Sequence, residues 1–108
     1  SDRAKYVHSY AEALLAAGDL SGAEARLAEA LAVYEKRGSE FKGLARWQLA
    51  VISARRGARE ETLRRLRAAA DAGQPKDALF ADPSLQKWRN KGSSLRSISS
   101  RVASLEYL

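Results

Sequence analysis

The sequence of 108 residues contains no cysteine and no methionine, and its one histidine is His8. Without cysteine the chain has no disulfide, no thiolate metal ligand and no cysteine nucleophile, which leaves the redox compartment open. Without methionine the chain as given does not begin at a translation start, so we expect a processed product or a piece of a longer protein. The longest apolar runs, such as residues 13–17, are too short to cross a membrane, so we expect a soluble or peripheral protein, intracellular or organellar.

Groups that carry out catalysis or hold metals are also scarce. His8 and Glu12 form an i, i+4 pair, but a metal site needs three or four ligands and the sequence has no second cluster. No serine lies in a nucleophile-elbow motif, and the glycines occur singly rather than in a phosphate-binding loop. The sequence therefore predicts no catalytic residue, no metal site and no cofactor, and His8 is expected to be an ordinary, partly exposed side chain.

The residues that are present are typical of one globular domain with a single core. Hydrophobic residues make up 45% of the sequence and charged residues 30%. The net charge is +6, and the excess is uneven. Up to residue 54 seven basic residues match seven acidic ones, whereas from Arg55 onward twelve basic residues stand against six acidic ones. The second half is therefore the electropositive end.

Apolar residues recur at helical spacing on both sides of Gly18, which predicts two helices joined by a tight turn. Those before the turn are Val7, Tyr10, Ala11, Leu14 and Leu15. Those after it are Ala23, Leu27, Ala30, Leu31 and Tyr34. We predict helices from the first residues to 17 and from about 21 to 37. Gly18 suits the left-handed residue that ends a helix, and Ser21 and Glu24 have the spacing of a capping box.

The same arrangement recurs further along the chain. Ser39 is a plausible N-cap for a third helix over residues 40–56, and Gly57 ends it. The apolar residues of this helix are Phe41, Leu44, Ala45, Trp47, Leu49, Val51 and Ile52. A fourth helix over residues 59–72 ends at Gly73, and its apolar residues are Leu63, Leu66, Ala69 and Ala70. The two helix–glycine–helix units repeat with 39 residues between Gly18 and Gly57.

This chain resembles the tetratricopeptide-repeat family. The first unit keeps the family pattern at Val7, Tyr10-Ala11, Leu14, Gly18-Asp19-Leu20, Ala23, Leu27 and Ala30-Leu31. The second keeps it at Leu49-Ala50, Gly57, Leu66 and Ala69, and departs from it at Arg46, Ser53 and Thr62. The spacing exceeds the usual period of about 34 residues, as in the long-repeat branch of the family. The resemblance implies an all-α fold of antiparallel helix-turn-helix repeats, stacked as a short right-handed superhelix.

We expect a repeat domain over residues 1–92, with repeats at about 4–37 and 40–73 and a cap at 74–92. In the cap, Gln74-Pro75 breaks the fourth helix and Asp82-Pro83 starts a short one to about residue 90. Its Leu85 and Trp88 are expected to cover the fourth helix. A serine-rich tail, residues 93–108, carries an amphipathic stripe of Leu95, Ile98, Val102, Leu105 and Leu108. Whether the tail packs on the repeats or binds a partner is left open.

Stacked helix pairs present a concave groove to extended peptides or helices. By resemblance, the groove residues are Lys5, His8, Ser9, Glu12, Leu44, Trp47, Gln48, Val51 and Arg55. Two alternatives stand for Trp47: with Leu44 and Val51 it forms either a binding hot spot or a packing surface against the preceding repeat. The lysine-and-asparagine clamp of chaperone-docking members is absent, so chaperone-tail binding is not predicted.

The basic second half has two interpretations. Glu60–Arg64 and Glu61–Arg65 are predicted i, i+4 pairs on a solvated helix face. A basic patch with fewer acidic neighbours remains, formed by Arg55, Arg56, Arg59, Arg67, Lys87, Arg89 and Lys91. It is either plain solvated surface or a contact for an acidic protein or an anionic membrane surface. The absence of stacking aromatics among the arginines argues against nucleic acid.

These observations favour a non-catalytic module for protein–protein interaction, a scaffold or assembly factor that binds a segment of another protein in its groove. The partner segment is an extended peptide, a helix or a subunit of a larger complex. One alternative is an electrostatic adaptor whose basic end docks on an anionic membrane surface, an acidic protein or a nucleic acid. Another is that the tail is itself the ligand of another protein's groove.

Overall fold

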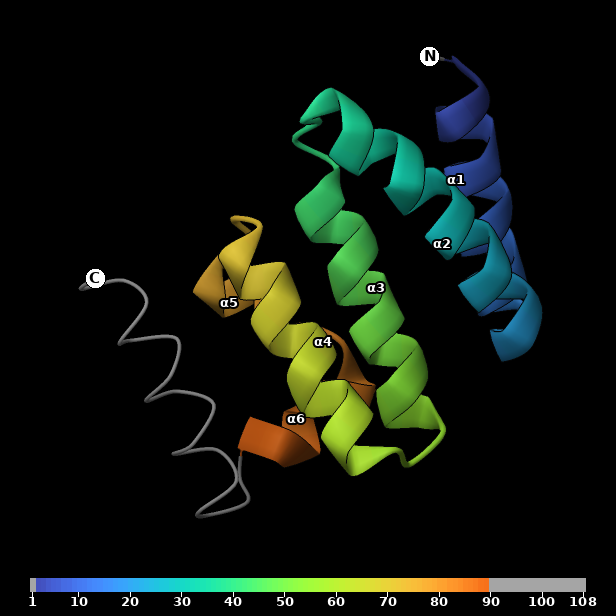
Figure 1. Cartoon of the computed structure of the whole chain (residues 1–108). Coiled ribbons are helices and arrows are strands. Elements are labelled where there is room, and N and C mark those ends of the chain that lie inside the picture. Colours follow the sequence, from blue (N-terminus) through green and yellow to red (C-terminus); the bar gives the residue numbers. More distant parts are fainter. Residues whose placement is uncertain (1, 90–108) are drawn as a thin grey trace.

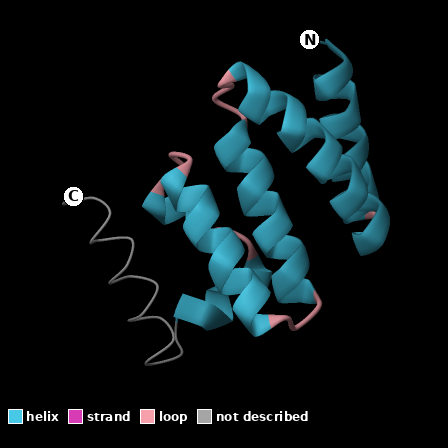
Figure 2. Cartoon of the chain, in the orientation of Figure 1, coloured by secondary structure: helices cyan, strands magenta, loops and turns pink. Residues whose placement is uncertain are grey.

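Six helices make up the part of the chain that the structure describes. The computed structural model describes residues 2–89, without the side chains of residues 2, 76, 77 and 87–89. The helices are α1 (Asp2–Ala16), α2 (Leu20–Arg37), α3 (Lys42–Arg55), α4 (Arg59–Asp71), α5 (Lys76–Leu79) and α6 (Pro83–Arg89). Short loops join them, and residues 2–89 contain no strand, so the predicted all-α class is confirmed (Figure 1, Figure 2). None of these helices is long and apolar enough to cross a membrane.

Glycine ends the first helix of each pair, as predicted. Gly18 and Gly57 have φ angles of 86° and 75°, in the left-handed region where a Cβ would be strained. After Gly18 the N–H of Asp19 turns back to the carbonyl of Leu14 at 2.9 Å, and the equivalent bond after Gly57 measures 3.0 Å. The two turns fold α2 back onto α1 and α4 back onto α3 (Figure 1).

The start of α2 differs from the prediction. Asp19 is its N-cap, because the Asp19 carboxylate accepts a hydrogen bond from the backbone N–H of Gly22 at 3.0 Å. Ser21 lies within the helix, so the predicted capping box of Ser21 and Glu24 is wrong. The aspartate directly after the hinge already supplies the acceptor that α2 needs, which leaves the Glu24 side chain available for other helices.

The start of α3 is close to the prediction. The Ser39 hydroxyl accepts a hydrogen bond from the N–H of Phe41 at 3.1 Å, so Ser39 caps a turn that leads into the helix. The helix itself begins at Lys42, two residues after the predicted start. This turn, together with Gly38 at a φ of 64°, brings the chain from the end of α2 to the side of α4.

Helix α3 lies at the centre of the molecule and is buried on two sides (Figure 1). The side toward α1 and α2 buries Ala45, Leu49 and Ile52. The side toward α4, α5 and α6 buries Ala50, Val51 and Ala54. Because both helix pairs bury apolar surface against α3, this helix joins them into one stack.

Two aromatic residues of the predicted apolar helix faces are exposed. Tyr10 is 57% exposed, and Phe41 is 38% exposed with its ring at the edge of Tyr34, 5.7 Å between centroids. Helical spacing predicts the side of a helix on which a residue lies, but not how far the partner helix reaches around it. On α1 the neighbouring Ala11 is fully buried, since its small side chain allows close helix contact.

The chain after α4 adds two short helices to the core. Helix α4 ends at Asp71, before Gly73 with its φ of 97° and before Gln74-Pro75. Helix α5 begins directly after Pro75 and was not predicted. The start of α6 is confirmed: the Asp82 carboxylate accepts a hydrogen bond from the Ser84 N–H at 2.9 Å. Leu79 of α5 and Leu85 of α6 are both buried against α3 and α4. The side chain of Trp88 and the tail at 93–108 lie outside the described part of the chain.

Three polar residues replace the small or apolar residues of the family pattern, and each has a partner. Arg46 forms an ion pair with Glu35 of α2 at 2.8 Å. The Ser53 hydroxyl accepts a hydrogen bond from Arg65 of α4 at 2.7 Å. The Thr62 hydroxyl donates to the carbonyl four residues before it at 2.7 Å. Two of the three departures therefore tie neighbouring helices together through side chains.

Candidate functional site

A hollow of about 270 Å³ lies between α1, α3 and the residue that precedes α6. We call it the α1–α3 hollow, and its lining residues are Glu12, Leu15, Ala16, Trp47, Gln48, Val51, Arg55 and Asp82. Five of the nine predicted groove residues belong to this set, because i, i+3 and i, i+4 spacing puts them on the facing sides of α1 and α3. A pocket of this size accommodates one side chain of a partner rather than a whole small molecule.

The other predicted groove residues lie around the hollow or beneath it. Lys5 and Ser9 are exposed on α1, about two turns and one turn before Glu12. Leu44 is half-buried on α3. His8 is only 7% exposed, so the expectation of a partly exposed side chain is wrong. His8 is buried because Tyr34 of α2 and Gln48 of α3 both contact its ring.

A chain of hydrogen bonds runs from the core to the hollow through His8. The His8 Nδ1 lies 2.8 Å from the Tyr34 hydroxyl, and its Nε2 lies 2.6 Å from Oε1 of Gln48. Gln48 is itself 7% exposed, and its Nε2 donates to the Glu12 carboxylate at 2.8 Å. We call these four side chains, from α1, α2 and α3, the polar relay. Each buried polar group in it has a partner, as a low-dielectric interior requires.

The acceptor at the end of the polar relay fixes the direction of every bond. An ionised carboxylate only accepts, so Glu12 requires the N–H of the Gln48 amide. The Gln48 oxygen then faces His8 and requires a hydrogen on Nε2. In the neutral imidazole Nδ1 is left as an acceptor, and the Tyr34 hydroxyl donates to it. Burial of Tyr34, with the Glu12 charge as a smaller cause, raises the pKa of its hydroxyl, which keeps it protonated as a donor.

Trp47 forms part of the wall of the hollow, and contacts with the core fix its side chain. Its indole N–H donates to the carbonyl of Leu79 at 2.9 Å, and its ring packs against the core cluster of α3 to α6. Trp47 packs on the segment that follows the second helix pair, so the predicted packing against the preceding repeat is wrong. The indole is therefore immobilised where it lines the hollow. The alternative of a binding hot spot stays a prediction.

Arg55, two turns after Trp47 on α3, and Asp82 also line the hollow. The Arg55 guanidinium lies 3.3 Å from the Asp82 carboxylate and donates to the Leu15 carbonyl at 3.4 Å. Burial opposes ionisation of Asp82, but hydrogen bonds from Ser84 and the Arg55 charge outweigh it and lower the pKa of this carboxyl. The charges of Arg55 and Asp82 therefore offset each other at the rim of the hollow.

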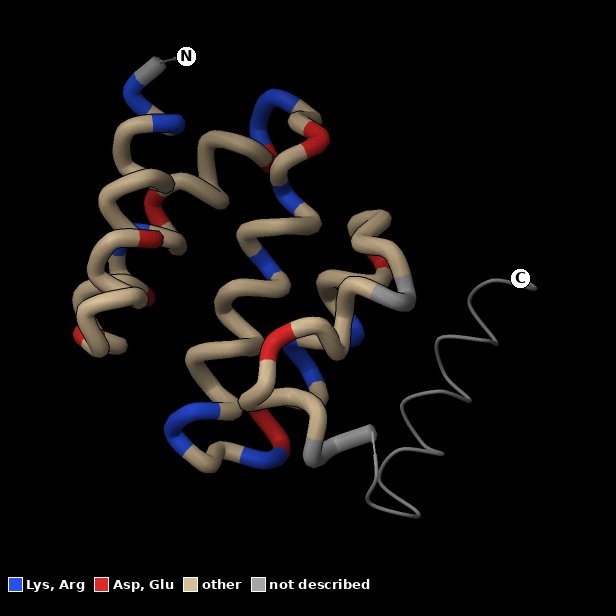
Figure 3. Tube along the Cα trace, turned by 180° about the vertical axis from the view of Figure 1, so that it is seen from behind, with Lys and Arg blue, Asp and Glu red and all other residues tan. Residues whose placement is uncertain are grey.

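The predicted basic patch is partly paired within the chain. The sequence predicted fewer acidic neighbours for these arginines, but Arg55 is paired with Asp82 and Arg56 lies 2.8 Å from Glu24, so the prediction is wrong for these two. Basic segments flank the turn between α3 and α4 on both sides, and an acidic segment follows in the first turn of α4 (Figure 3). Arg59 and Arg67 are exposed. The side chains of Lys87 and Arg89, and the whole of Lys91, lie outside what the structure describes.

Glu24 is the centre of an ion-pair network that joins three helices. Arg56 from the end of α3 and Arg65 from α4 approach it at 2.8 and 2.6 Å. The hydrogen bond from Arg56 lowers the pKa of the Glu24 carboxyl; burial opposes this, and the bond and charge of Arg65 add to it. Arg65 also makes the predicted i, i+4 pair with Glu61 at 3.0 Å.

The second predicted pair on α4 is not formed. Arg64 pairs with Glu61, three residues before it, instead of with Glu60. Glu61 therefore forms ion pairs with both Arg64 and Arg65, since it lies on the side of α4 that faces Glu24 and the rest of the network.

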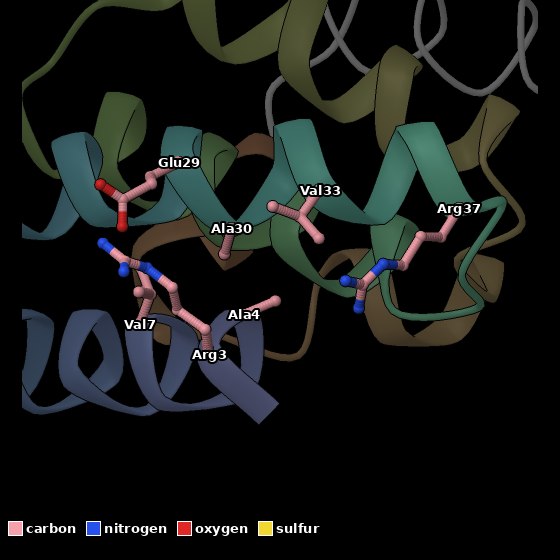
Figure 4. Close-up of a pocket in the computed structure, with 7 residues that line it drawn as sticks. All are labelled: Arg3, Ala4, Val7, Glu29, Ala30, Val33 and Arg37. Carbon is pink, nitrogen blue, oxygen red and sulfur yellow. The ribbon is translucent and has the colours of Figure 1, made fainter. Parts of the chain in front are cut away.

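A second hollow, of about 220 Å³, lies between α1 and α2 on the side away from α3. Figure 4 shows three residues of α1 facing four of α2 across it, with the Arg3 side chain extending toward Glu29. Its floor is formed by small apolar side chains, among them Val7 and Val33. No residue here was predicted as a site, and the space has no polar side chain beyond Arg3, Glu29 and Arg37.

Sequence reasoning missed three residues of the α1–α3 hollow. Leu15 and Ala16 were assigned to the core side or left out, although they lie one turn after Glu12. Asp82 was recognised as a helix cap, but nothing local in the sequence indicates that α6 returns to α3. Within residues 2–89 no three His, Asp or Glu side chains gather in a way that holds a metal ion. The arrangement offers a carboxylate, an indole and an ion pair, which are groups for binding.

Comparison of the chain with protein-family models, curated proteins and solved structures found no match.

Proposed function

We propose that the chain is a non-catalytic interaction module that binds a segment of another protein on the face formed by α1 and α3, as a scaffold or assembly factor does. In this proposal the two helix pairs are tetratricopeptide-like repeats in a right-handed stack. The observation that carries the proposal is the α1–α3 hollow, where residues from both first helices converge beside an exposed strip of α1. The positive φ of the hinge glycines and the central position of α3 also support it.

The hollow suits a partner segment because its walls are rigid before binding. Trp47 is fixed by its bond to Leu79, and Gln48 is fixed by the polar relay. A site that is already ordered loses little conformational entropy when a ligand binds. Lys5 and Ser9 continue the surface along α1, so a segment longer than one side chain has further contacts.

Trp47→Ala is a poor test of this function because it removes a core contact as well as a wall of the hollow. Ala16→Arg is sharper: Ala16 is exposed, ends α1 and lines the hollow, so a long side chain there fills the space. Ala28→Arg is the matched control, since Ala28 is exposed on α2 and lines neither hollow.

The experiment uses short random peptides displayed on phage and selected on the native chain. Selected peptides are expected to lose at least tenfold in affinity for Ala16→Arg and to bind Ala28→Arg within twofold of the native chain. Selection of no peptide, or of peptides that bind both variants equally well, would contradict a binding face between α1 and α3.

The electrostatic adaptor has weaker support. Two of the arginines on which it depends, Arg55 and Arg56, are occupied by Asp82 and Glu24. Exchanging these partners for lipid or phosphate would leave the partly buried Asp82 carboxylate without its cation and would take one of two arginines from Glu24.

A further inference from the structure

The α1–α3 hollow differs in charge from the chain as a whole. The chain carries a net charge of +6. Three charged residues line the hollow: Glu12, Arg55 and Asp82. Arg55 and Asp82 neutralise each other at 3.3 Å, whereas Glu12 has no ion pair with any side chain that the structure describes. The hollow is therefore a locally acidic spot on a basic molecule, and its net charge resides on Glu12.

The Glu12 carboxylate is fixed by a hydrogen bond from a buried side chain. The Gln48 N–H binds one carboxylate oxygen, Oε2, and the polar relay anchors Gln48 in turn. Within the described residues no donor reaches the other oxygen, Oε1, so it remains available to a ligand. A carboxylate fixed by a buried amide and open on its other oxygen is a directed acceptor for a charged donor.

The wall beside Glu12 suits the same kind of ligand. Trp47 lines the hollow, and its indole is held by the bond to the Leu79 carbonyl. The indole is the side chain that best attracts a cation to its face. Leu15 adds an apolar surface against which the methylene groups of a long side chain pack.

We propose that the α1–α3 hollow binds an arginine or lysine side chain of the partner segment, with Glu12 as the acceptor and Trp47 as the aromatic wall. This inference rests on the proposed function and adds the chemistry of the ligand. A basic ligand is the opposite of what the net charge of the chain favours, because a positive net charge by itself attracts acidic partners. An acidic side chain placed in the hollow would face the uncompensated Glu12 and be repelled.

The test uses two sets of random peptides displayed on phage, one with arginine fixed at the centre and one with glutamate. Each set is selected on the native chain. Peptides from the arginine set are then resynthesised with citrulline, which is neutral and close to arginine in shape. Affinities are measured for the native chain, for Glu12→Gln and for Glu40→Gln. Glu40 is exposed and makes no ion pair among the described residues, so Glu40→Gln is the matched change of charge away from the hollow.

We expect selection from the arginine set and not from the glutamate set. The citrulline replacement should weaken binding roughly tenfold on the native chain and on Glu40→Gln. On Glu12→Gln it should cost less than twofold, since the acceptor charge is gone while the carboxamide oxygen still accepts from Gln48. Equal selection from both sets, or equal affinity of arginine and citrulline peptides for the native chain, would overturn the proposal.

The Ala16→Arg variant distinguishes failure of the basic-side-chain proposal from failure of the proposed docking face. Peptides that lose affinity for Ala16→Arg but do not distinguish arginine from citrulline would refute the basic-side-chain proposal and leave the docking face standing. Peptides that bind Ala16→Arg as tightly as the native chain would refute both.

Discussion

At the scale of single residues, His8 organises the interior of the first three helices. Its Nδ1 accepts from the Tyr34 hydroxyl on α2 at 2.8 Å, and its Nε2 donates to the Gln48 oxygen on α3 at 2.6 Å. A buried polar group without its partner costs far more than a satisfied one contributes. Each member of the polar relay therefore depends on the next, and Glu12 at its outer end depends on all of them for its position.

Tyr34→Phe tests this dependence. The change removes the hydroxyl that His8 Nδ1 needs and leaves the rest of a buried ring in place, so we expect the free energy of unfolding to fall by about 1–2 kcal/mol. Urea denaturation followed by circular dichroism measures it. Tyr10→Phe is the control, because Tyr10 is 57% exposed and makes no hydrogen bond among the described residues, and it should change stability little. Equal stability of the two variants would show that the relay contributes nothing.

Glu24 gives a pH dependence with a defined sign. Its pKa is lowered from the ordinary 4.5 in the folded chain, chiefly by the hydrogen bond from Arg56. Its contribution to stability is therefore complete above pH 4.5 and is lost as the pH falls through the lowered folded value. We expect the stability difference between the native chain and Glu24→Gln, measured by urea denaturation, to be largest near neutral pH and to shrink below pH 4.5. A difference that is constant from pH 7 to pH 3 would exclude this role.

At the scale of helices, the segment after α4 belongs to the core. Leu79 and Leu85 are almost completely buried in the cluster that includes Val51 and Leu66. Trp47 of α3 joins the same cluster and bonds to the backbone of α5. The second helix pair has an apolar side that the first pair does not reach, and α5 and α6 cover it.

Leu85→Ala tests whether α6 stabilises the whole fold. Removing a fully buried leucine leaves a cavity, and we expect a loss of about 2–4 kcal/mol in the free energy of unfolding. Thermal and urea denaturation measure it, with Leu20→Ala as a half-buried leucine in α2 for comparison. A loss below about 1 kcal/mol, or smaller than that of Leu20→Ala, would show that α6 is only loosely attached.

The four long helices could be predicted from the sequence because their signals are local. Gly18 and Gly57 mark helix ends by their own conformational freedom, and apolar spacing marks the faces between them. The Asp19 cap was missed because Ser21 and Glu24 offered an equally local alternative. Helix α5 was missed because four residues are too few for a periodic pattern.

Helical spacing predicted only the part of the candidate site that lies on the facing sides of α1 and α3. Glu12, Trp47 and Gln48 converge because each lies on the facing side of its helix. Burial of His8, and pairing of Arg55 with Asp82, depend on contacts between residues 27 to 40 positions apart. No local pattern encodes such contacts, so these features became visible in the fold alone.

At the scale of the whole molecule, α3 provides much of the buried core and one side of the proposed binding face. Two of its sides are buried against the helix pairs, and the residues between those sides line the α1–α3 hollow. Polar contacts across the stack, from the polar relay on one side and the Glu24 network on the other, fix α1, α2 and α4 relative to α3. The hollow is thus a consequence of how the pairs stack.

The most direct test of the account maps a bound peptide onto the chain by NMR. A peptide selected from the arginine set is titrated into the ¹⁵N-labelled native chain, and the shifts of the backbone amides are followed. We expect the largest shifts at Ser9, Glu12, Gln48 and Arg55, and little change at Ala28 on the outer side of α2. Shifts that cluster at Val7 and Val33, around the second hollow, or along α4 would contradict a binding face between α1 and α3.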